Sequence, residues 1–202
     1  ATVTGDLTGD VIEDRNVLPS THQIEVAGHV LSYDPDGQIG FRVGTGTKVS
    51  DPFNGSLHIS QHGTWVYDVD NSKLQHLGEG EEVLVTYTIH TVDGTAQNIV
   101  LKVIGTNDAP TVVATTLNGT EDSDFTFSAA NFGFTDVDTK DSLDHVTITS
   151  VPDITEGVLL LNGKVVSAGQ NIDDADLSSL VFKPVHDFNG DVHFKYTVND
   201  GH

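Results

Sequence analysis

The stretch Val83-Leu84-Val85-Thr86-Tyr87-Thr88-Ile89 decides the fold class. Val83, Val85, Tyr87 and Ile89 fall on one face and the threonines fall mostly on the other, which is the alternation of a half-buried β-strand. The same period of two recurs along the chain, whereas helical periodicity is nearly absent. The sequence therefore predicts an all-β protein.

Short alternating segments divided by Gly, Pro, Asn and Asp turns indicate antiparallel β-sandwiches rather than βαβ units. One helical turn is expected from Asp173 to Ser178, where Asp side chains can cap it. Strands are predicted at residues 24–33, 41–43, 57–60, 64–67, 82–90, 97–104, 125–128, 146–151, 157–161, 164–166, 180–182 and 193–198.

The pattern is interrupted at Gly105-Thr106-Asn107-Asp108-Ala109-Pro110. Pro110 cannot donate a ladder hydrogen bond and biases Ala109 toward an extended conformation, so this segment is expected to be a stiff connector. We predict a first sandwich at residues 1–106, a connector at 107–110 and a second sandwich at 111–202. Each has about 100 residues, the usual size of a seven-stranded immunoglobulin-like module.

The two halves share the order of their motifs, which indicates tandem modules. The motifs are Glu13-Asp14, Asp34-Pro35-Asp36, Tyr87-Thr88-Ile89 and Asp93-Gly94 in the first half, and Glu121-Asp122, Asp136-Val137-Asp138, Tyr196-Thr197-Val198 and Asp200-Gly201 in the second. In the first half the Asp-Gly turn leads into a further strand, whereas the second half stops at His202. The second module is therefore expected to lack its last strand, either through truncation or because another chain supplies it.

The composition favours cations as partners. The 202 residues carry 30 acidic and 9 basic side chains, a formal net charge of -21, and no Cys. Nucleic acid is not expected as a partner, because nine cations cannot supply a phosphate-binding surface, and the absence of Cys excludes disulfides, zinc-thiolate sites and thiol catalysis. No apolar run approaches the length of a membrane span, so membrane insertion is not expected. Of the acidic residues 23 are Asp and 7 are Glu, and Asp favours turns and supplies short, stiff oxygen ligands of the kind that Ca²⁺ binds.

The first half closely resembles the VCBS-type repeat of giant bacterial surface adhesins. The resemblance is carried by Gly63-Thr64-Trp65-Val66-Tyr67, Asp70-Asn71-Ser72, Leu77-Gly78-Glu79-Gly80-Glu81, Asp93-Gly94 and the connector motif. The second half is similar to the cadherin-like repeats that occur beside VCBS repeats in RTX-type adhesins. This similarity is carried by Glu121-Asp122, Phe132-Gly133-Phe134, Asp136-Val137-Asp138, Phe188-Asn189-Gly190 and Tyr196-Thr197-Val198-Asn199-Asp200-Gly201.

The resemblance implies two tandem immunoglobulin-like or cadherin-like sandwiches in a calcium-rigidified extender of an extracellular adhesin, on the bacterial cell surface and with a role in cell adhesion and biofilm formation. Its partners would be neighbouring repeats of the same polypeptide, and a host or biofilm ligand would bind elsewhere in the full protein. The cadherin resemblance implies one joint site, an upper half-site and a lower half-site. They consist of Glu13, Asp70, Asn107, Asp108, Asp136, Asp138 and Asp200 for the joint, Asp34, Asp36 and Asp93 for the upper half, and Glu121 for the lower one.

Other interpretations remain open for the same residues. Asn107-Asp108-Ala109-Pro110 and Asp34-Pro35-Asp36-Gly37 also suit simple turns, in which Asn and Asp side chains bond to the backbone. The chain could alternatively be a module that binds a polysaccharide or a protein. An enzyme is not expected, because the sequence has no nucleophile elbow, P-loop or His-Glu-x-x-His motif, although paired carboxylates can meet in space without any sequence signal.

Overall fold

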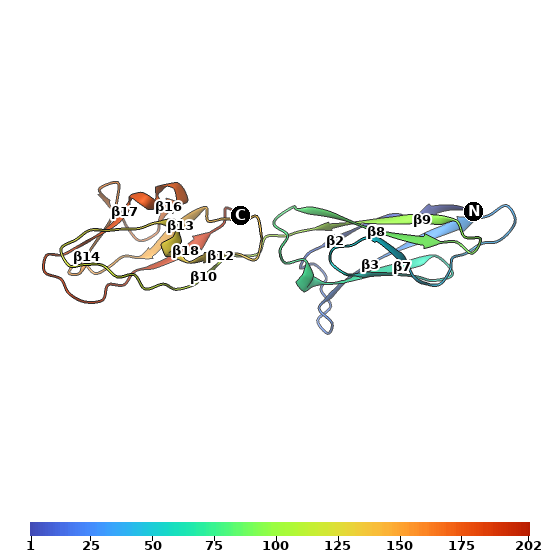
Figure 1. Cartoon of the computed structure of the whole chain (residues 1–202), viewed down its shortest axis with the longest axis horizontal. Helices are drawn as coiled ribbons and strands as arrows, with labels where there is room; N and C mark the ends of the chain where they lie inside the picture. The colour runs from blue at the N-terminus through green and yellow to red at the C-terminus, as the bar shows by residue number, and fades with distance from the viewer. The chain divides into compact units, whose positions relative to one another are not determined.

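The computed structural model describes residues 1–202 and divides them into two units, Ala1–Asn107 and Asp108–His202. Both units consist almost wholly of β-strands, with three short 3-10 helices, η1 (Asn71–Lys73), η2 (Ala129–Phe132) and η3 (Asp174–Ser179) (Figure 1). The predicted all-β sandwich fold is confirmed. None of the helices has the length and hydropathy of a membrane-spanning segment.

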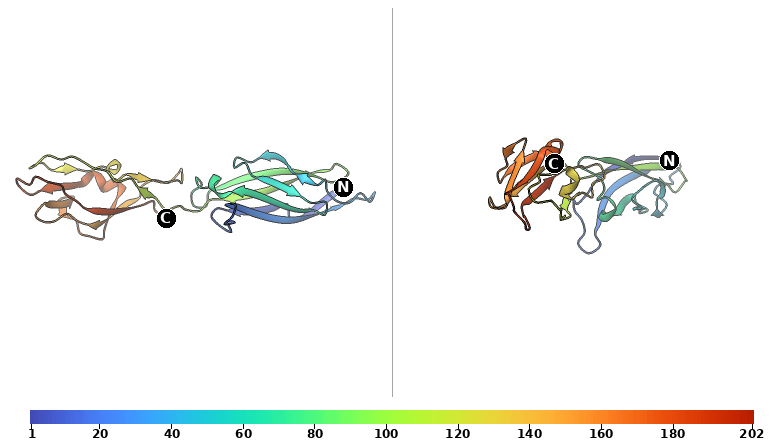
Figure 2. Two further views of the ribbon diagram at one scale, coloured as in Figure 1. Left: turned by 90° about the horizontal axis from the view of Figure 1, so that it is seen from below. Right: turned by 60° about the vertical axis from the view of Figure 1, so that its left-hand side comes forward.

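Unit 1 contains a four-stranded and a five-stranded sheet. The first has the order β2 (Thr8–Ile12), β9 (Ala96–Ile104), β8 (Glu82–His90) and β5 (Thr47–Ser50); the second has the order β1 (Thr2–Gly5), β3 (Gln23–Tyr33), β7 (Thr64–Asp70), β6 (Ser56–Ile59) and β4 (Gly44–Thr45). The hairpin β8–β9 is antiparallel and pairs Tyr87 with Ile99, while β2 and β9 are parallel and pair Thr8 with Val100. Figure 2 shows these strands from two further directions. Strand β9 thus lies between β8 and β2 in this sheet.

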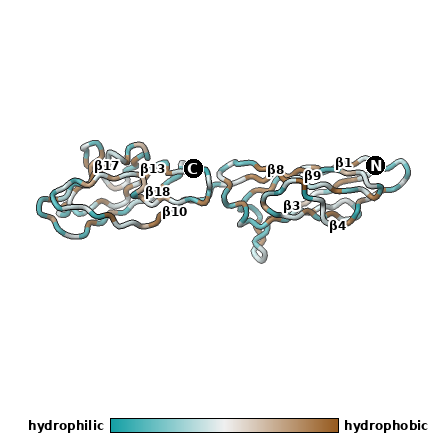
Figure 3. The backbone as a smooth tube through the Cα atoms, viewed as in Figure 1, coloured by the Kyte–Doolittle hydropathy of each residue, from teal (hydrophilic) through white to brown (hydrophobic).

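The core of unit 1 forms because the alternating residues of its strands point between the sheets. Trp65 and Tyr67 of β7 are fully buried, as are Ile99 and Leu101 of β9. Gly28 of β3 makes room for the Trp65 ring, since a Cβ at that position would lie 2.3 Å from the ring carbon Cζ2. Figure 3 shows hydrophobic residues along β8 and β9, in keeping with their buried faces.

Unit 2 contains three small sheets. They are β11 (Phe125–Thr126), β17 (Leu180–Pro184), β14 (Gly157–Leu161) and β15 (Lys164–Val165); β16 (Gln170–Asp173), β13 (His145–Ser150) and β18 (Lys195–Asn199); and β10 (Thr111–Val112) with β12 (Phe134–Thr135). Its core includes Phe132, Ile148, Leu159, Leu177 and Leu180, each at most 1% exposed. The pairing β10–β12 places the start of the unit beside the segment that leads into the Asp136 loop.

The strand predictions differ from the structure in several places, and β4, β5, β10, β12 and β16 are among the strands that were not predicted. The strand predicted at 41–43 is wrong, since Phe41 makes only an isolated bridge with Thr91, and the flanking Gly40 and Gly44 have φ angles of +107° and +137° that interrupt an extended run. Strands β1 and β2 were not predicted, because their residues are mostly polar and show no apolar alternation. The helical turn expected at residues 173–178 is confirmed as η3.

Candidate metal centre

Three carboxylates of unit 2 converge although they come from distant parts of its sequence. Asp136 follows β12 directly, Asp141 lies in the same loop, and Asp200 follows the end of β18. One carboxylate oxygen from each lies within 4.8 Å of the other two, and all three residues are half-buried. Oxygens bound to one Ca²⁺ at about 2.4 Å can be at most about 4.8 Å apart, so this spacing suits a common ion.

Asp138 is the organising residue of this cluster. It is 2% exposed, its Oδ2 accepts a hydrogen bond of 2.9 Å from the amide of Asp108, and its own amide donates to Asp136 Oδ1 at 2.9 Å. The amide of Asp141 donates to the Asp138 carbonyl at 3.1 Å, which closes the loop as a turn. These bonds tie the first residue of the unit to the loop that follows β12.

The electrostatics of the cluster disfavour the ionised form of Asp138. Burial raises the pKa of its carboxyl group, and the nearby carboxylates of Asp136, Asp141 and Asp200 raise the pKa further. The hydrogen bond from the Asp108 amide acts in the opposite direction, because it stabilises the charged form. The balance is a carboxyl group with a pKa above its ordinary value.

The cluster contains buried oxygens with no hydrogen-bond partner: Asp136 Oδ2, Asp138 Oδ1 and Asp141 Oδ2. Buried polar atoms are nearly always satisfied in folded proteins, and an unsatisfied carboxylate oxygen is costly. Several hard, anionic oxygens pointing at one place are the donor set that Ca²⁺ prefers. The residues present therefore fit a calcium ion.

Unit 1 holds its predicted site residues in a different arrangement. Glu13 is 1% exposed, and its carboxylate accepts hydrogen bonds from the Thr106 amide at 3.0 Å and from Gln75 Nε2 at 2.9 Å. The amide of Asn107 donates to Glu79 Oε2 at 3.1 Å, so Glu79 fixes the end of this unit, although it was not among the predicted site residues.

Asp70 acts as a helix cap in the structure. Its Oδ1 accepts from the Ser72 amide at 2.9 Å at the start of η1, and the bonds to Ser72 hold the pKa of Asp70 below its usual value. This local role matches the preference of Asp for the N-cap position.

The structure brings Asp34 and Asp93 of unit 1 together. The amino group of Ala1 donates to Asp93 Oδ2 at 2.6 Å and lies 3.4 Å from Asp34 Oδ2. This amino group is the main cause of the lowered pKa of Asp93, followed by the hydroxyl of Thr91. The amide of Asp36 donates to Asp34 Oδ1 at 2.7 Å, so the Asp-x-Asp motif forms a turn that orients Asp34.

Glu121, the residue predicted for the lower half-site, is exposed, and it is the neighbouring Asp122 whose carboxylate lies close to other potential ligands. Asp122 groups with His186 and Asp187, all three exposed; the Asp187 amide donates to Asp122 Oδ1 at 2.9 Å, and His186 Nδ1 lies 2.9 Å from Asp187 Oδ2. Because these groups are solvated and bonded to one another, they make a weaker ion site than the Asp136 cluster.

The family comparison concerns unit 2. A family model of the cadherin-like domain matches residues 106–202. The match includes every residue of the Asp136 cluster. No curated protein matches the chain.

One solved structure to which the chain is similar is described as "Ca2+-stabilized adhesin helps an Antarctic bacterium reach out and bind ice". The two share 12% sequence identity with a TM-score of 0.30, over 98% of this chain and 48% of that one. The chain thus spans about half the length of that protein.

Of the residues predicted for the joint, the structure gathers Asp108, Asp136, Asp138 and Asp200 within unit 2. Sequence reasoning missed Asp141, although the spacing Asp-x-Asp-x-x-Asp from residue 136 to residue 141 could have indicated it.

Proposed function

We propose that the chain is a calcium-rigidified extender segment of a large extracellular bacterial surface adhesin, in which a VCBS-type unit precedes a cadherin-like unit, as in RTX-type adhesins. The observation that carries the proposal is the set of buried, unpartnered carboxylate oxygens on Asp136, Asp138 and Asp141. The family match of residues 106–202 supports it. Cell adhesion and biofilm formation are the processes in which such a segment would take part.

The chain's own residues would prepare the site for the ion. The turn from Asp136 to Asp141 brings the carboxylates of these two residues to one place, and Asp200 adds a third from the end of β18. Bound calcium would supply two positive charges and six to eight coordination positions. Asp138 shares its carboxylate between the cluster and the Asp108 amide, so neutralising the cluster would also secure the backbone of Asp108.

Stiffening follows from where the chain is anchored. The amide of Asn107 is held by Glu79 in unit 1, and the amide of the next residue, Asp108, is held by Asp138 in unit 2. The two hydrogen-bonded amides belong to adjacent residues, Asn107 and Asp108. A cation that strengthens the second anchor would therefore restrict rotation of the connector, which is what an extender under tension requires.

The test compares the whole chain with its Asp138→Asn variant, in excess calcium and in EDTA. We expect calcium to raise the melting temperature of wild type and to narrow the distribution of interatomic distances from small-angle X-ray scattering. Asp138→Asn should weaken both responses, whereas the exposed control Asp124→Asn should leave them unchanged. Melting and scattering profiles that are the same with and without calcium would refute the proposal.

A further inference from the structure

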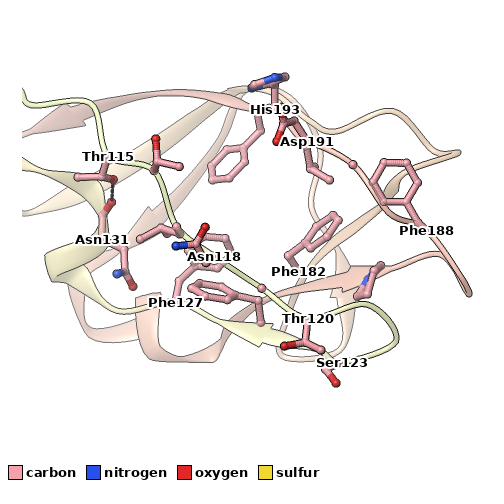
Figure 4. A pocket seen from close by; sticks show the side chains of 18 of the residues that line it. Thr115, Asn118, Thr120, Ser123, Phe127, Asn131, Phe182, Phe188, Asp191 and His193 are labelled. Atoms are coloured by element: carbon pink, nitrogen blue, oxygen red, sulfur yellow. Dashed lines mark hydrogen bonds between the residues drawn. The ribbon is translucent and has the colours of Figure 1, made fainter.

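The sheet of β11, β17, β14 and β15 has one face turned toward the core of unit 2 and one turned away from it. Leu159 is buried in the core, and Figure 4 shows the ring of Phe182 directed into the pocket that it lines on the inner side. Successive side chains of a strand point to opposite faces, so the neighbours Leu160 and Val181 belong to the outer face. Neither of them packs against the core of this unit.

Pairing between the strands aligns apolar residues across this outer face. Leu160 of β14 lies opposite Val181 of β17 on one side and opposite Val165 of β15 on the other. Val158 lies on the same face of β14, two residues before Leu160. Val165 is 66% exposed and the other three are partly exposed. These four branched side chains, Val158, Leu160, Val165 and Val181, form an apolar surface that we call the outer patch.

The corresponding face of unit 1 is largely polar. Its sheet has the matching order β3-β7-β6, and Ser56, His58 and Asp68 alternate there with buried residues of β6 and β7. The Ser56 hydroxyl donates to Asp68 Oδ1 at 2.9 Å and lies 3.2 Å from His58 Nε2. A sandwich of this kind therefore folds with polar residues on this face, so folding alone does not account for the outer patch.

Charges of both signs lie at the outer patch, although unit 2 as a whole is strongly acidic, with 16 acidic and 4 basic side chains. Lys183 is on the same face, opposite Val158, and it makes no ion pair within the unit. Asp124 directly precedes β11 and Glu156 directly precedes β14, at the end of the sheet where Lys183 lies. An equally acidic molecule would meet less repulsion here than on a purely acidic surface.

We propose that the outer patch is a self-association surface, on which the same sheet of a second copy of this chain packs face to face about a two-fold axis. In a two-fold contact the same surface is used by both copies, so each outer patch would cover the other. Lys183 of each copy would approach Asp124 or Glu156 of the other. An apolar surface bordered by both signs of charge is complementary to itself, which favours a second copy over an unrelated protein.

The contact would join extender segments side by side, and it uses none of the residues of the Asp136 cluster. Sedimentation velocity of the whole chain in calcium, at concentrations up to about 1 mM, measures the association, since a small interface is weak. We expect the sedimentation coefficient to rise with concentration toward that of a dimer. The amide resonances of Val158, Leu160 and Val181 should shift over the same concentration range.

Matched variants locate the contact. Val165→Asp, in the edge strand β15, should weaken the association at least tenfold. Val49→Asp is the control, because Val49 is 60% exposed in the edge strand β5 of unit 1 and the substitution adds the same charge; it should leave the association unchanged. Lys183→Glu, which removes the cation of the outer face, should also weaken the association at least tenfold. Thermal melts show whether each variant is folded, and Lys183→Glu carries the comparison if Val165→Asp does not fold.

The outcomes separate this contact from others. A dimer that Val165→Asp and Lys183→Glu weaken, and that Val49→Asp does not, supports the proposal. A chain that stays monomeric up to about 1 mM overturns it and leaves the outer patch to a different protein. A dimer that the control weakens as much as the two variants of unit 2 also overturns it, because the contact then lies elsewhere on the chain.

Discussion

Replacing Asp141 with asparagine should change the stability of unit 2 in opposite directions with and without calcium. The substitution keeps the shape of the side chain and removes one of three charges whose oxygens lie within 4.8 Å of one another. Without the ion, the charge of Asp141 repels those of Asp136 and Asp200. With the ion, the same charge is a ligand.

The size of the effect follows from this distance. Two unit charges at 4.8 Å repel by about 1 kcal/mol in a water-like medium and about 3.5 kcal/mol at an effective dielectric constant of 20. Because Asp141 is half-exposed and salt screens it, we expect Asp141→Asn to stabilise unit 2 by about 1–2 kcal/mol in EDTA. Calcium at 100 times its dissociation constant should stabilise the wild type by about 2.7 kcal/mol, and a tenfold loss of affinity should remove about 1.4 kcal/mol of this.

The two units can be followed separately in one experiment. Trp65 is the only tryptophan, and it is fully buried in unit 1, so its fluorescence reports the unfolding of that unit. A calorimetric transition without a change in tryptophan fluorescence belongs to unit 2. In a unit of this size, 1 kcal/mol corresponds to a shift of about 4–8 °C in melting temperature, which calorimetry resolves.

A matched control is Asp124→Asn, which removes an exposed charge from the same unit. It should shift the unit 2 transition by much less than Asp141→Asn in either condition. If Asp141→Asn destabilises unit 2 in EDTA and leaves the calcium-induced shift intact, then Asp141 is neither repelled by its neighbours nor a ligand, and the reasoning fails.

Three further predictions concern pH and the core of unit 1. Because the pKa of Asp138 is raised, folded unit 2 binds more protons than the unfolded chain at pH values between the ordinary aspartate pKa and the raised one. In EDTA the free energy of unfolding of unit 2 should therefore fall as the pH rises through that window. Thermal melts at several pH values measure this slope, and calcium should remove it. Gly28→Ala should destabilise unit 1 by about 1–3 kcal/mol in urea unfolding followed by tryptophan fluorescence, because the added Cβ would overlap the Trp65 ring. Tyr87→Phe should destabilise unit 1 by about 1–2 kcal/mol in the same assay, because the Tyr87 hydroxyl donates to Asp51 at 2.7 Å in a buried site.

The sequence predicts a strand correctly when the strand's own apolar and polar residues alternate and the apolar ones are buried. Strand β8 was predicted with its observed bounds because Val85, Tyr87 and Ile89 alternate with polar residues and are buried. Strand β1 has the sequence Thr-Val-Thr-Gly and exists because β3 pairs with it, a tertiary cause with no local pattern. Phe41 shows the converse, since its side chain is buried in the core while its backbone makes a single bridge.

The candidate site was predictable to the extent that it is local. The Asp-x-Asp motif at Asp136 is visible in the sequence because its turn forms through its own amide and carboxylate groups. The approach of Asp200 to Asp141 depends on the end of β18, so their proximity has no signal in the spacing along the chain. Asp70 was also predicted as a ligand, although Asn71-Ser72 offers no second acidic residue after it, and only the structure shows that it caps η1.

The buried carboxylate of Asp138 is the strongest physical argument for a cation. A neutral side chain of similar size could accept the Asp108 amide with no charge to bury, and replacing buried charges with neutral groups is commonly neutral or stabilising. An aspartate surrounded by Asp136, Asp141 and Asp200 therefore lowers the stability of the ion-free unit. The same repulsion is what a divalent ion would relieve, so the penalty without the ion and the gain on binding it have one origin. A chain with a net charge of -21 carries many aspartates that only keep it soluble, and a buried carboxylate oxygen without a hydrogen-bond partner is the property that sets Asp136, Asp138 and Asp141 apart.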